Sequence, residues 1–155
     1  MKTKILTDPH PTLRKTADRF DFDLPISDRI TVSNQLSILL PRSGGYAIAA
    51  PQIGVSRACF IYKAEGERGI VFNPHIVSVS EETWPFLEGC LSIPGKFFPV
   101  ERPRSIVAVG YNIRGEQTTY ELTDLLARIF QHEIGHLNGE LVTDHVSTTV
   151  PGTES

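Results

Sequence analysis

The sequence predicts a single domain of the α+β class with a mostly antiparallel sheet. The chain has 155 residues, a length typical of one domain. Its periodic patterns come in the order helix, strands, helix, whereas a parallel sheet would alternate strands with helices. A hairpin pattern late in the chain adds an antiparallel pair. We expect one domain over residues 1–146, followed by a flexible tail over 147–155, because that last segment is small and polar.

The first half of the chain predicts one helix and three short strands. A helix is expected over 27–40, with Ser27 as its N-cap and Pro41 as the residue that stops it. A loop is expected over 41–45. Segments rich in β-branched and aromatic residues, separated by Gly or Pro, then predict strands over 57–62, 69–72 and 76–80.

The second half predicts a hairpin followed by a helix. Strand-like segments over 105–112 and 117–122 flank a short turn over 113–116. From Thr123 or Asp124 to Asn138 the apolar spacing becomes helical. Gly139 stands where a glycine commonly ends a helix.

Composition and charge exclude several classes of protein. The formal charge is −3 and the pI about 5.9, so no basic surface indicates nucleic acid or anionic lipid. We find no signal peptide at the N-terminus and no run near the ~18 apolar residues of a membrane span. Two cysteines, Cys59 and Cys90, exclude a disulfide scaffold. We therefore expect a cytoplasmic protein with reduced thiols.

The last predicted helix carries the strongest chemical signal, an H-E-x-x-H pattern. His132 and His136 lie one helical turn apart on the same face and can hold one metal ion. Glu133 lies close enough to reach a water on that ion without being a ligand. Leu125, Ile129 and the two histidines continue one core-facing stripe. The alternative is a pair of core histidines, each bonded to a carbonyl.

Two upstream segments offer further groups. Cys90 follows Gly89, and its thiolate beside two imidazoles would make a three-ligand site with an open position, as in catalytic metal sites. Alternatively Cys90 is a small buried hydrophobe. His145 lies downstream, but the H-x-x-G-x-x-H extension of zinc proteases is absent. A small-residue run over 44–54 ends near Gln52, whose amide is a neutral donor; the alternative is a tightly packed turn.

Together, the segments 45–52, 88–92 and 131–136 resemble the peptide deformylase family in order and spacing. The family patterns are G-x-G-x-A-A-x-Q, E-G-C-x-S and Q-H-E-x-D-H, and the resemblance covers residues 5–144. It implies mostly antiparallel sheets around a central helix that carries H-E-x-x-H. It also implies metal-dependent removal of the N-formyl group from the N-terminal formyl-methionine of nascent polypeptides, with release of formate.

The resemblance also implies a role for each site residue. The metal ligands would be Cys90, His132 and His136. They would hold one divalent ion, most typically Fe²⁺, with Zn²⁺, Ni²⁺ or Co²⁺ as substitutes. Glu133 would take a proton from the attacking water and deliver it to the leaving amine. The Gln52 amide and the Leu91 backbone N–H would face the formyl oxygen.

The implied substrate site combines backbone and side chains. Its residues would be Gly45, Tyr46, Ala47, Phe86, Gly89, Leu125, Arg128 and Ile129. The backbone near Gly45 would pair with the extended nascent peptide, and any ribosome association is expected to be transient. Glu88 and Arg102 are expected to form a supporting ion pair, the alternative being unrelated surface charges.

Three residues depart from the family pattern. Ala47 replaces a glycine and would be strained only at a positive φ. Gly135 replaces an aspartate inside the helix and costs about 1 kcal/mol of helix propensity. Arg128 stands where an apolar residue is usual, and it either places its guanidinium in water or changes the side-chain pocket. These departures keep open a deformylase-like protein with weak activity, another N-acyl substrate or a non-catalytic binding role.

Overall fold

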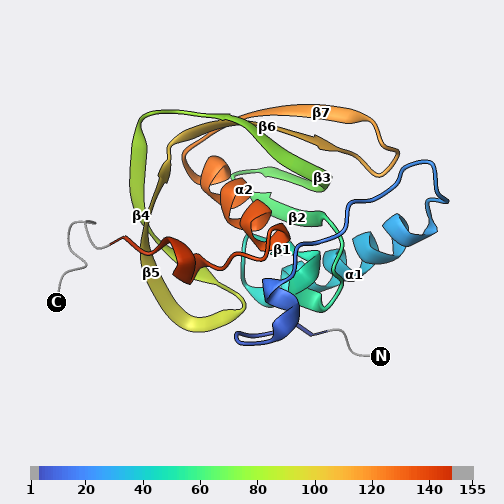
Figure 1. Cartoon of the computed structure of the whole chain (residues 1–155), viewed down its shortest axis with the longest axis horizontal. Helices are drawn as coiled ribbons and strands as arrows, with labels where there is room; N and C mark the ends of the chain where they lie inside the picture. Colours follow the sequence, from blue (N-terminus) through green and yellow to red (C-terminus); the bar gives the residue numbers. More distant parts are fainter. Residues whose placement is uncertain (1–3, 148–155) are drawn as a thin grey trace.

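A computed structural model describes residues 4–147, and within them the predicted α+β class is confirmed (Figure 1). The larger sheet is antiparallel, in the order β1-β2-β3-β6-β7. Its strands are β1 (Ala47–Ala49), β2 (Cys59–Ala64), β3 (Glu67–Val79), β6 (Ser105–Tyr111) and β7 (Gln117–Thr123). A separate two-stranded sheet pairs β4 (Thr83–Cys90) with β5 (Ile93–Pro103). The α-helices are α1 (Ser27–Ser43) and α2 (Asp124–Leu137), and the 3₁₀ helices are η1 (Pro11–Arg14), η2 (Ala50–Ile53) and η3 (Val142–His145).

The larger sheet buries a different helix on each face. Neighbouring residues of one strand point to opposite faces, so Phe60 and Val71 belong to the cluster that contains Phe130 of α2. Cys59 and Phe72 belong instead to the cluster that contains Leu36 of α1. Figure 1 shows α2 in the middle of the molecule, with the large sheet on one side and β4–β5 on the other. The central helix is therefore in contact with both sheets.

The first helix is longer than predicted. It begins at Ser27, but the N-cap is Ile26 rather than Ser27, and the helix continues through Pro41 to Ser43. Pro41 removes only one backbone donor, and the hydroxyl of Ser43 donates to the Leu40 carbonyl at 2.7 Å. The helix ends at Gly44, whose φ of +76° is left-handed. The prediction that Pro41 stops the helix was therefore wrong. The predicted loop over 41–45 was wrong for residues 41–43, which belong to the helix.

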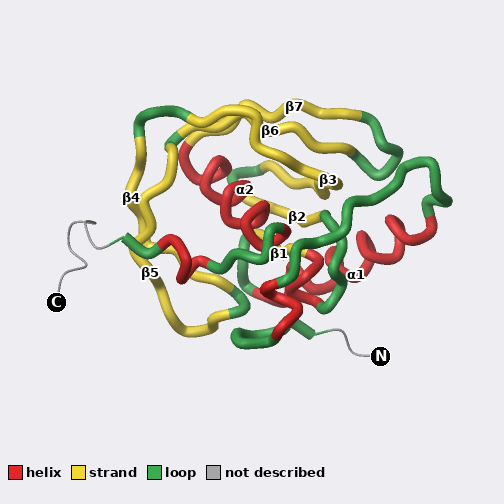
Figure 2. The backbone as a smooth tube through the Cα atoms, viewed as in Figure 1, coloured by secondary structure: helices red, strands yellow, loops and turns green. Residues whose placement is uncertain are grey.

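The predicted strands are present with shifted or merged bounds. The segment over 57–62 corresponds to β2, and the segments over 69–72 and 76–80 join into the single strand β3. A bulge near Asn73, whose φ is +46°, interrupts the register of β3 with β6. The hairpin β6–β7 is confirmed, with each strand differing from its predicted bounds by one residue at its C-terminal end (Figure 2). The strands β4 and β5 were not predicted.

The helix α2 is held at both ends. Its N-cap is Thr123, and the Asp124 carboxylate accepts a hydrogen bond from Arg104 Nε at 2.7 Å. Gly139 follows the helix with a φ of +76°, and a Cβ there would lie 2.5 Å from the Arg14 carbonyl oxygen. The predicted helix and its glycine stop are therefore confirmed, one residue shorter than expected.

Only the first part of the C-terminal segment, up to Ser147, belongs to the described residues. Val146 forms a bridge with Val100, and the Ser147 backbone N–H donates to the Pro99 carbonyl at 2.7 Å. Residues 148–155 of the predicted tail lie outside the described residues, so the division into domain and tail remains a prediction. None of the helices within 4–147 is long and apolar enough to cross a membrane.

Candidate active site

The end of β4 and one face of α2 bring a thiol and two imidazoles together. One ligand atom each from Cys90, His132 and His136 lies within 4.8 Å of the other two. Cys90 Sγ is 3.5 Å from His136 Nε2, and the two imidazole centroids are 5.0 Å apart. Cys90 and His136 are buried, and the His132 side chain is only 11% exposed. This donor set suits one divalent metal ion of intermediate softness.

A carboxylate behind the cluster orients His132. Glu88 Oε1 lies 2.9 Å from His132 Nδ1, which leaves Nε2 free to face Cys90 and His136. Arg102 donates to the same carboxylate from Nε at 2.6 Å and from Nη2 at 3.0 Å. The predicted ion pair between Glu88 and Arg102 is therefore present and buried, and these residues are not unrelated surface charges. A second guanidinium, that of Arg128, also contacts Glu88.

Burial and close charges shift the pKa values of the cluster. Burial raises the pKa of Glu88, but hydrogen bonds from His132 and Arg102 outweigh it and hold the pKa at about 2. Burial lowers the pKa of His132, but Cys90 and Glu88 outweigh this and raise it to about 10. Burial, and then the charge of His132, move the pKa of His136 well below its usual value. The cluster therefore contains a permanently ionised Glu88 and a neutral His136.

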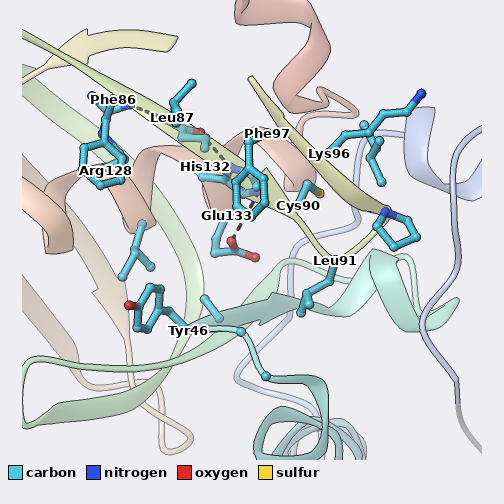
Figure 3. Close-up of a pocket in the computed structure, with 18 of the residues that line it drawn as sticks. Tyr46, Phe86, Leu87, Cys90, Leu91, Lys96, Phe97, Arg128, His132 and Glu133 are labelled. Atoms are coloured by element: carbon cyan, nitrogen blue, oxygen red, sulfur yellow. Dashed lines mark hydrogen bonds and ion pairs between the residues drawn. The ribbon is translucent and has the colours of Figure 1, made fainter. Parts of the chain in front are cut away.

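Glu133 is a buried carboxylate beside the cluster. Its Oε2 lies 3.9 Å from His132 Nε2, and its Oε1 is buried with no hydrogen-bond partner among the described residues. Burial raises its pKa to about 7, although the charge of His132 opposes the shift. Figure 3 shows the Glu133 carboxylate facing the same space as Cys90 and His132. A group with this pKa can both accept and return a proton near neutral pH.

A short 3₁₀ helix places Gln52 on the far side of the cluster. Its Oε1 accepts from the Ala49 backbone N–H at 2.9 Å, which fixes the orientation of the amide. Its Nε2 then lies 3.1 Å from Ser92 Oγ and 4.0 Å from Cys90 Sγ. Sequence reasoning assigned no role to Ser92, which is fully buried. The signal that could have found it is its place as the last residue of the E-G-C-x-S pattern.

A pocket of about 550 Å³ opens over these groups. It is lined by Gln52, Cys90, Leu91, His132 and Glu133. It is also lined by all the residues predicted for the substrate: Gly45, Tyr46, Ala47, Phe86, Gly89, Leu125, Arg128 and Ile129. The tip of the β4–β5 hairpin adds Ile93, Pro94, Gly95, Lys96 and Phe97. These were missed because no hairpin was predicted there.

The three departures have different structural outcomes. Ala47 is absent from the residues with positive φ and pairs with Tyr62 in β1–β2, so its Cβ causes no backbone strain. A Cβ on Gly135 would meet only Glu140 Cβ, at 3.7 Å. The interpretation of Arg128 as a guanidinium in water is wrong, because this residue is only 4% exposed and is paired with Glu88.

This fold and this site define a class: a metal-dependent hydrolase with an H-E-x-x-H helix. A thiolate, two imidazoles and an adjacent buried carboxylate can hold a metal ion and supply a proton acceptor. His132 presents its Nε2 because Glu88 occupies Nδ1, and Glu133, whose Oε1 has no hydrogen-bond partner among the described residues, lines the same pocket. The residues present therefore fit one divalent ion.

Comparison with known proteins gives the family. A sequence model described as polypeptide deformylase matches residues 2–151. A peptide deformylase from Desulforudis audaxviator is 38% identical over 146 residues, covering 94% of each chain. The crystal structure of peptide deformylase from Thermotoga maritima superposes with a TM-score of 0.88 at 33% identity, covering 95% of this chain and 99% of that one. A probable peptide deformylase from Synechococcus phage S-SSM7 gives 0.85 at 32% identity, covering 93% and 99%.

The chain belongs to the polypeptide deformylase family. This family is metal-dependent, and the chain carries the Cys–His–His cluster such a metal needs. The prediction of a peptide deformylase is confirmed, and the comparisons give no support to a non-catalytic protein or to a different N-acyl substrate.

Proposed function

We propose that this protein hydrolyses the N-formyl group of N-terminal formyl-methionine on nascent polypeptides and releases formate. The observation that carries the proposal is the grouping of Cys90, His132 and His136 within 4.8 Å, beside the partnerless carboxylate of Glu133. The pocket above them is open to a peptide.

The metal ligands in this proposal are Cys90, His132 and His136, with Fe²⁺ as the native ion and Zn²⁺, Ni²⁺ or Co²⁺ as substitutes. One thiolate and two imidazoles suit all of these ions by softness. When bound, the ion supplies a Lewis acid that makes water a sufficient nucleophile at neutral pH. Glu88 supports the site by fixing the ring of His132.

Glu133 moves the proton in both halves of the reaction. It accepts a proton from water as the water oxygen bonds to the formyl carbon. When the C–N bond breaks, Glu133 returns this proton to the nitrogen, which leaves as the free amine of the peptide. The formyl carbon leaves as formic acid, which still carries the second proton of the water and releases it to solvent to give formate. A pKa of about 7 suits both transfers, because neither protonation state is strongly favoured at neutral pH.

Two neutral donors stabilise the charge that develops on the formyl oxygen. Gln52 Nε2 faces the cluster because Ala49 fixes the other end of the amide. The Leu91 backbone N–H, next to Cys90, is the second donor in this proposal. Donors held in place before the reaction stabilise an oxyanion without reorganisation.

The substrate peptide pairs with the edge of the larger sheet. β1 is the first strand of the sheet, and Gly45, Tyr46 and Ala47 line the pocket beside it. An extended peptide can add a strand to such an edge. The first side chain would lie among Tyr46, Phe86, Leu125, Arg128 and Ile129. In support, a class I type b peptide deformylase from Acinetobacter baumannii, 25% identical with a TM-score of 0.89, has been solved with Met-Ala-Ser bound.

The enzyme acts in the cytoplasm on chains that emerge from the ribosome, and any contact with the ribosome is transient. Formylated nascent peptides are its substrates, and the reduced state of Cys90 requires a reducing compartment.

The test is formate release from a formyl-Met tripeptide after anaerobic purification and metal analysis. The wild-type protein should contain about one metal ion per chain. Glu133→Ala should retain the metal but lose turnover by at least about 10²-fold, since it removes the proton carrier. Equal rates in the two proteins would refute the mechanism.

A further inference from the structure

Arg128 makes an unusual set of contacts for a residue in a substrate pocket. It is only 4% exposed and lies on α2, one turn before His132. Its Nη1 contacts Glu88 Oε2 and donates to the Val100 carbonyl at 3.1 Å, and its Nη2 contacts the Trp84 carbonyl. Its guanidinium also lies over the Trp84 and Phe86 rings, 5.4 and 5.6 Å from their centroids.

These contacts all reach one sheet. Trp84, Phe86 and Glu88 alternate along β4 and therefore share a face, while Val100 lies opposite Phe86 on β5. The two-stranded sheet has no strand pairing with the larger sheet among the described residues. Side chains that link the hairpin to α2 therefore help to fix its position, together with the backbone contacts of β5 with Val146 and Ser147.

We propose that Arg128 is a positioning residue, which clamps the β4–β5 hairpin onto α2 and so holds Cys90 at metal-ligating distance from His132 and His136. This inference rests on the proposed metal site. Cys90 is the last residue of β4, whereas both histidines belong to α2, so the ligand set spans the two elements that Arg128 joins. Arg128 also shares the Glu88 carboxylate with His132, which couples the clamp to the orientation of that imidazole.

The contacts argue against Arg128 as a direct ligand for the substrate side chain. Three of its N–H directions already point to Glu88, Val100 and Trp84, and its Nε is buried. The planar fork of arginine can serve several acceptors at fixed angles, whereas lysine offers one point charge. The clamp therefore needs arginine and not only a positive charge.

The experiment compares Arg128→Met and Arg128→Lys with the wild-type protein. Zinc affinity is measured on metal-free protein by competition with a chromogenic chelator. Arg128→Met should raise the zinc Kd about 10- to 100-fold, the usual effect of losing a group that orients ligands. Arg128→Lys should raise it less, by about threefold or more, because the charge on Glu88 is restored but the fork is lost.

A second measurement follows the hairpin itself. Iodoacetamide labelling of metal-free protein should be several times faster at Cys90 in Arg128→Met than in wild type. Cys59 serves as an internal reference, because it is fully buried and belongs to a different core cluster from Cys90. Faster labelling at both cysteines would show general unfolding and would overturn the positioning role.

The control variant is Arg14→Met. Arg14 pairs with Asp144 at 2.6 Å, but its side chain is 47% exposed and it makes no contact with Glu88. Its loss should leave zinc affinity and Cys90 labelling unchanged. If it weakened zinc binding as much as Arg128→Met, loss of any arginine would suffice and the inference would be overturned.

Kinetics separate positioning from specificity. Formyl-peptides that differ only in the first side chain should keep the same order of kcat/KM in both Arg128 variants. An altered order with an unchanged zinc Kd would make Arg128 a specificity residue and overturn the positioning role.

If Arg128→Met does not fold, an unchanged zinc Kd in Arg128→Lys overturns the positioning role equally. Failure of wild-type protein to bind zinc would instead refute the proposed metal site.

Discussion

The burial of Glu133 suits proton transfer but lowers the stability of the folded protein at neutral and higher pH. Folding buries this carboxylate and raises its pKa from 4.5 to about 7, so the folded state holds the proton more tightly than the unfolded chain. The contribution of this group to stability is therefore most favourable below about pH 4.5 and is lost as the pH rises through 7. The cost at pH 8 is about 3 kcal/mol.

Glu133→Gln should therefore stabilise the metal-free protein while abolishing turnover. Glutamine is neutral at every pH, so the gain in Tm over wild type should be largest near pH 8 and vanish near pH 4.5. Thermal unfolding of both proteins across this range measures the difference. A gain that stays constant with pH would show that the buried charge is not the cause.

Gly135 is a second residue at which stability can be tested without touching the chemistry. The helix α2 has no tertiary need for a glycine there, since an added Cβ would meet only Glu140 Cβ at 3.7 Å. Gly135→Ala should stabilise the protein by up to about 1 kcal/mol. That corresponds to a rise in Tm of about 3 °C with formate release unchanged.

The matched control for Gly135 is Gly139→Ala, four residues later. Gly139 has a φ of +76°, and an added Cβ would lie 2.5 Å from the Arg14 carbonyl oxygen. This variant should lower the Tm. If both alanine variants shifted the Tm in the same direction, local geometry would not explain the effect.

At the scale of elements, the sequence pattern predicted those helices and strands whose formation depends on neighbouring residues. The spacing of apolar residues, together with Gly139, was sufficient to predict α2. The turn over 113–116 between two strand-like segments was sufficient to predict the β6–β7 hairpin. The β4–β5 hairpin escaped prediction because prolines interrupt it, and these are tolerated in a two-stranded sheet, where each strand has an unpaired edge. The surroundings of Arg128 were unpredictable for the same reason, because all its partners lie on that hairpin.

The bulge in β3 is an element-scale feature with a testable cause. Asn73 has a φ of +46°, its Oδ1 accepts from the Phe20 backbone N–H, and its Nδ2 donates to the Phe20 carbonyl, both at 2.8 Å. Asn73→Ala loses two buried hydrogen bonds and strains the backbone, so it should cost about 2–4 kcal/mol.

Asn73→Gly isolates the backbone part of that cost. Glycine loses the same hydrogen bonds but adopts a positive φ without strain. It should be less destabilised than Asn73→Ala by about 1 kcal/mol in urea unfolding. Equal losses in the two variants would assign the whole effect to the hydrogen bonds.

At the scale of the whole molecule, the active site joins parts that are far apart in the sequence. Gln52 follows β1, Cys90 ends β4 and the histidines lie on α2, so three segments must dock before the site exists. The sequence motifs were specific enough to name these residues, because each motif is local. The residue patterns alone did not predict the separation into two sheets, since it depends on contacts between distant residues, whereas the family resemblance implied several sheets around a central helix.

Because the proposed ligands span α2 and β4, metal binding should stabilise the whole fold. An ion that binds only the folded state at 100 times its Kd adds about 2.7 kcal/mol. Protons compete for the same atoms, and the pKa of His132 in the metal-free protein is about 10. Affinity should thus fall by about tenfold for each pH unit below that value.

Thermal unfolding with a fixed zinc concentration at pH 8, 7 and 6 should show a gain in Tm that shrinks as the pH falls. Cys90→Ala, which lacks one ligand, should show little gain at any pH. A zinc effect of equal size in Cys90→Ala, or one independent of pH, would place the stabilising ion elsewhere on the molecule.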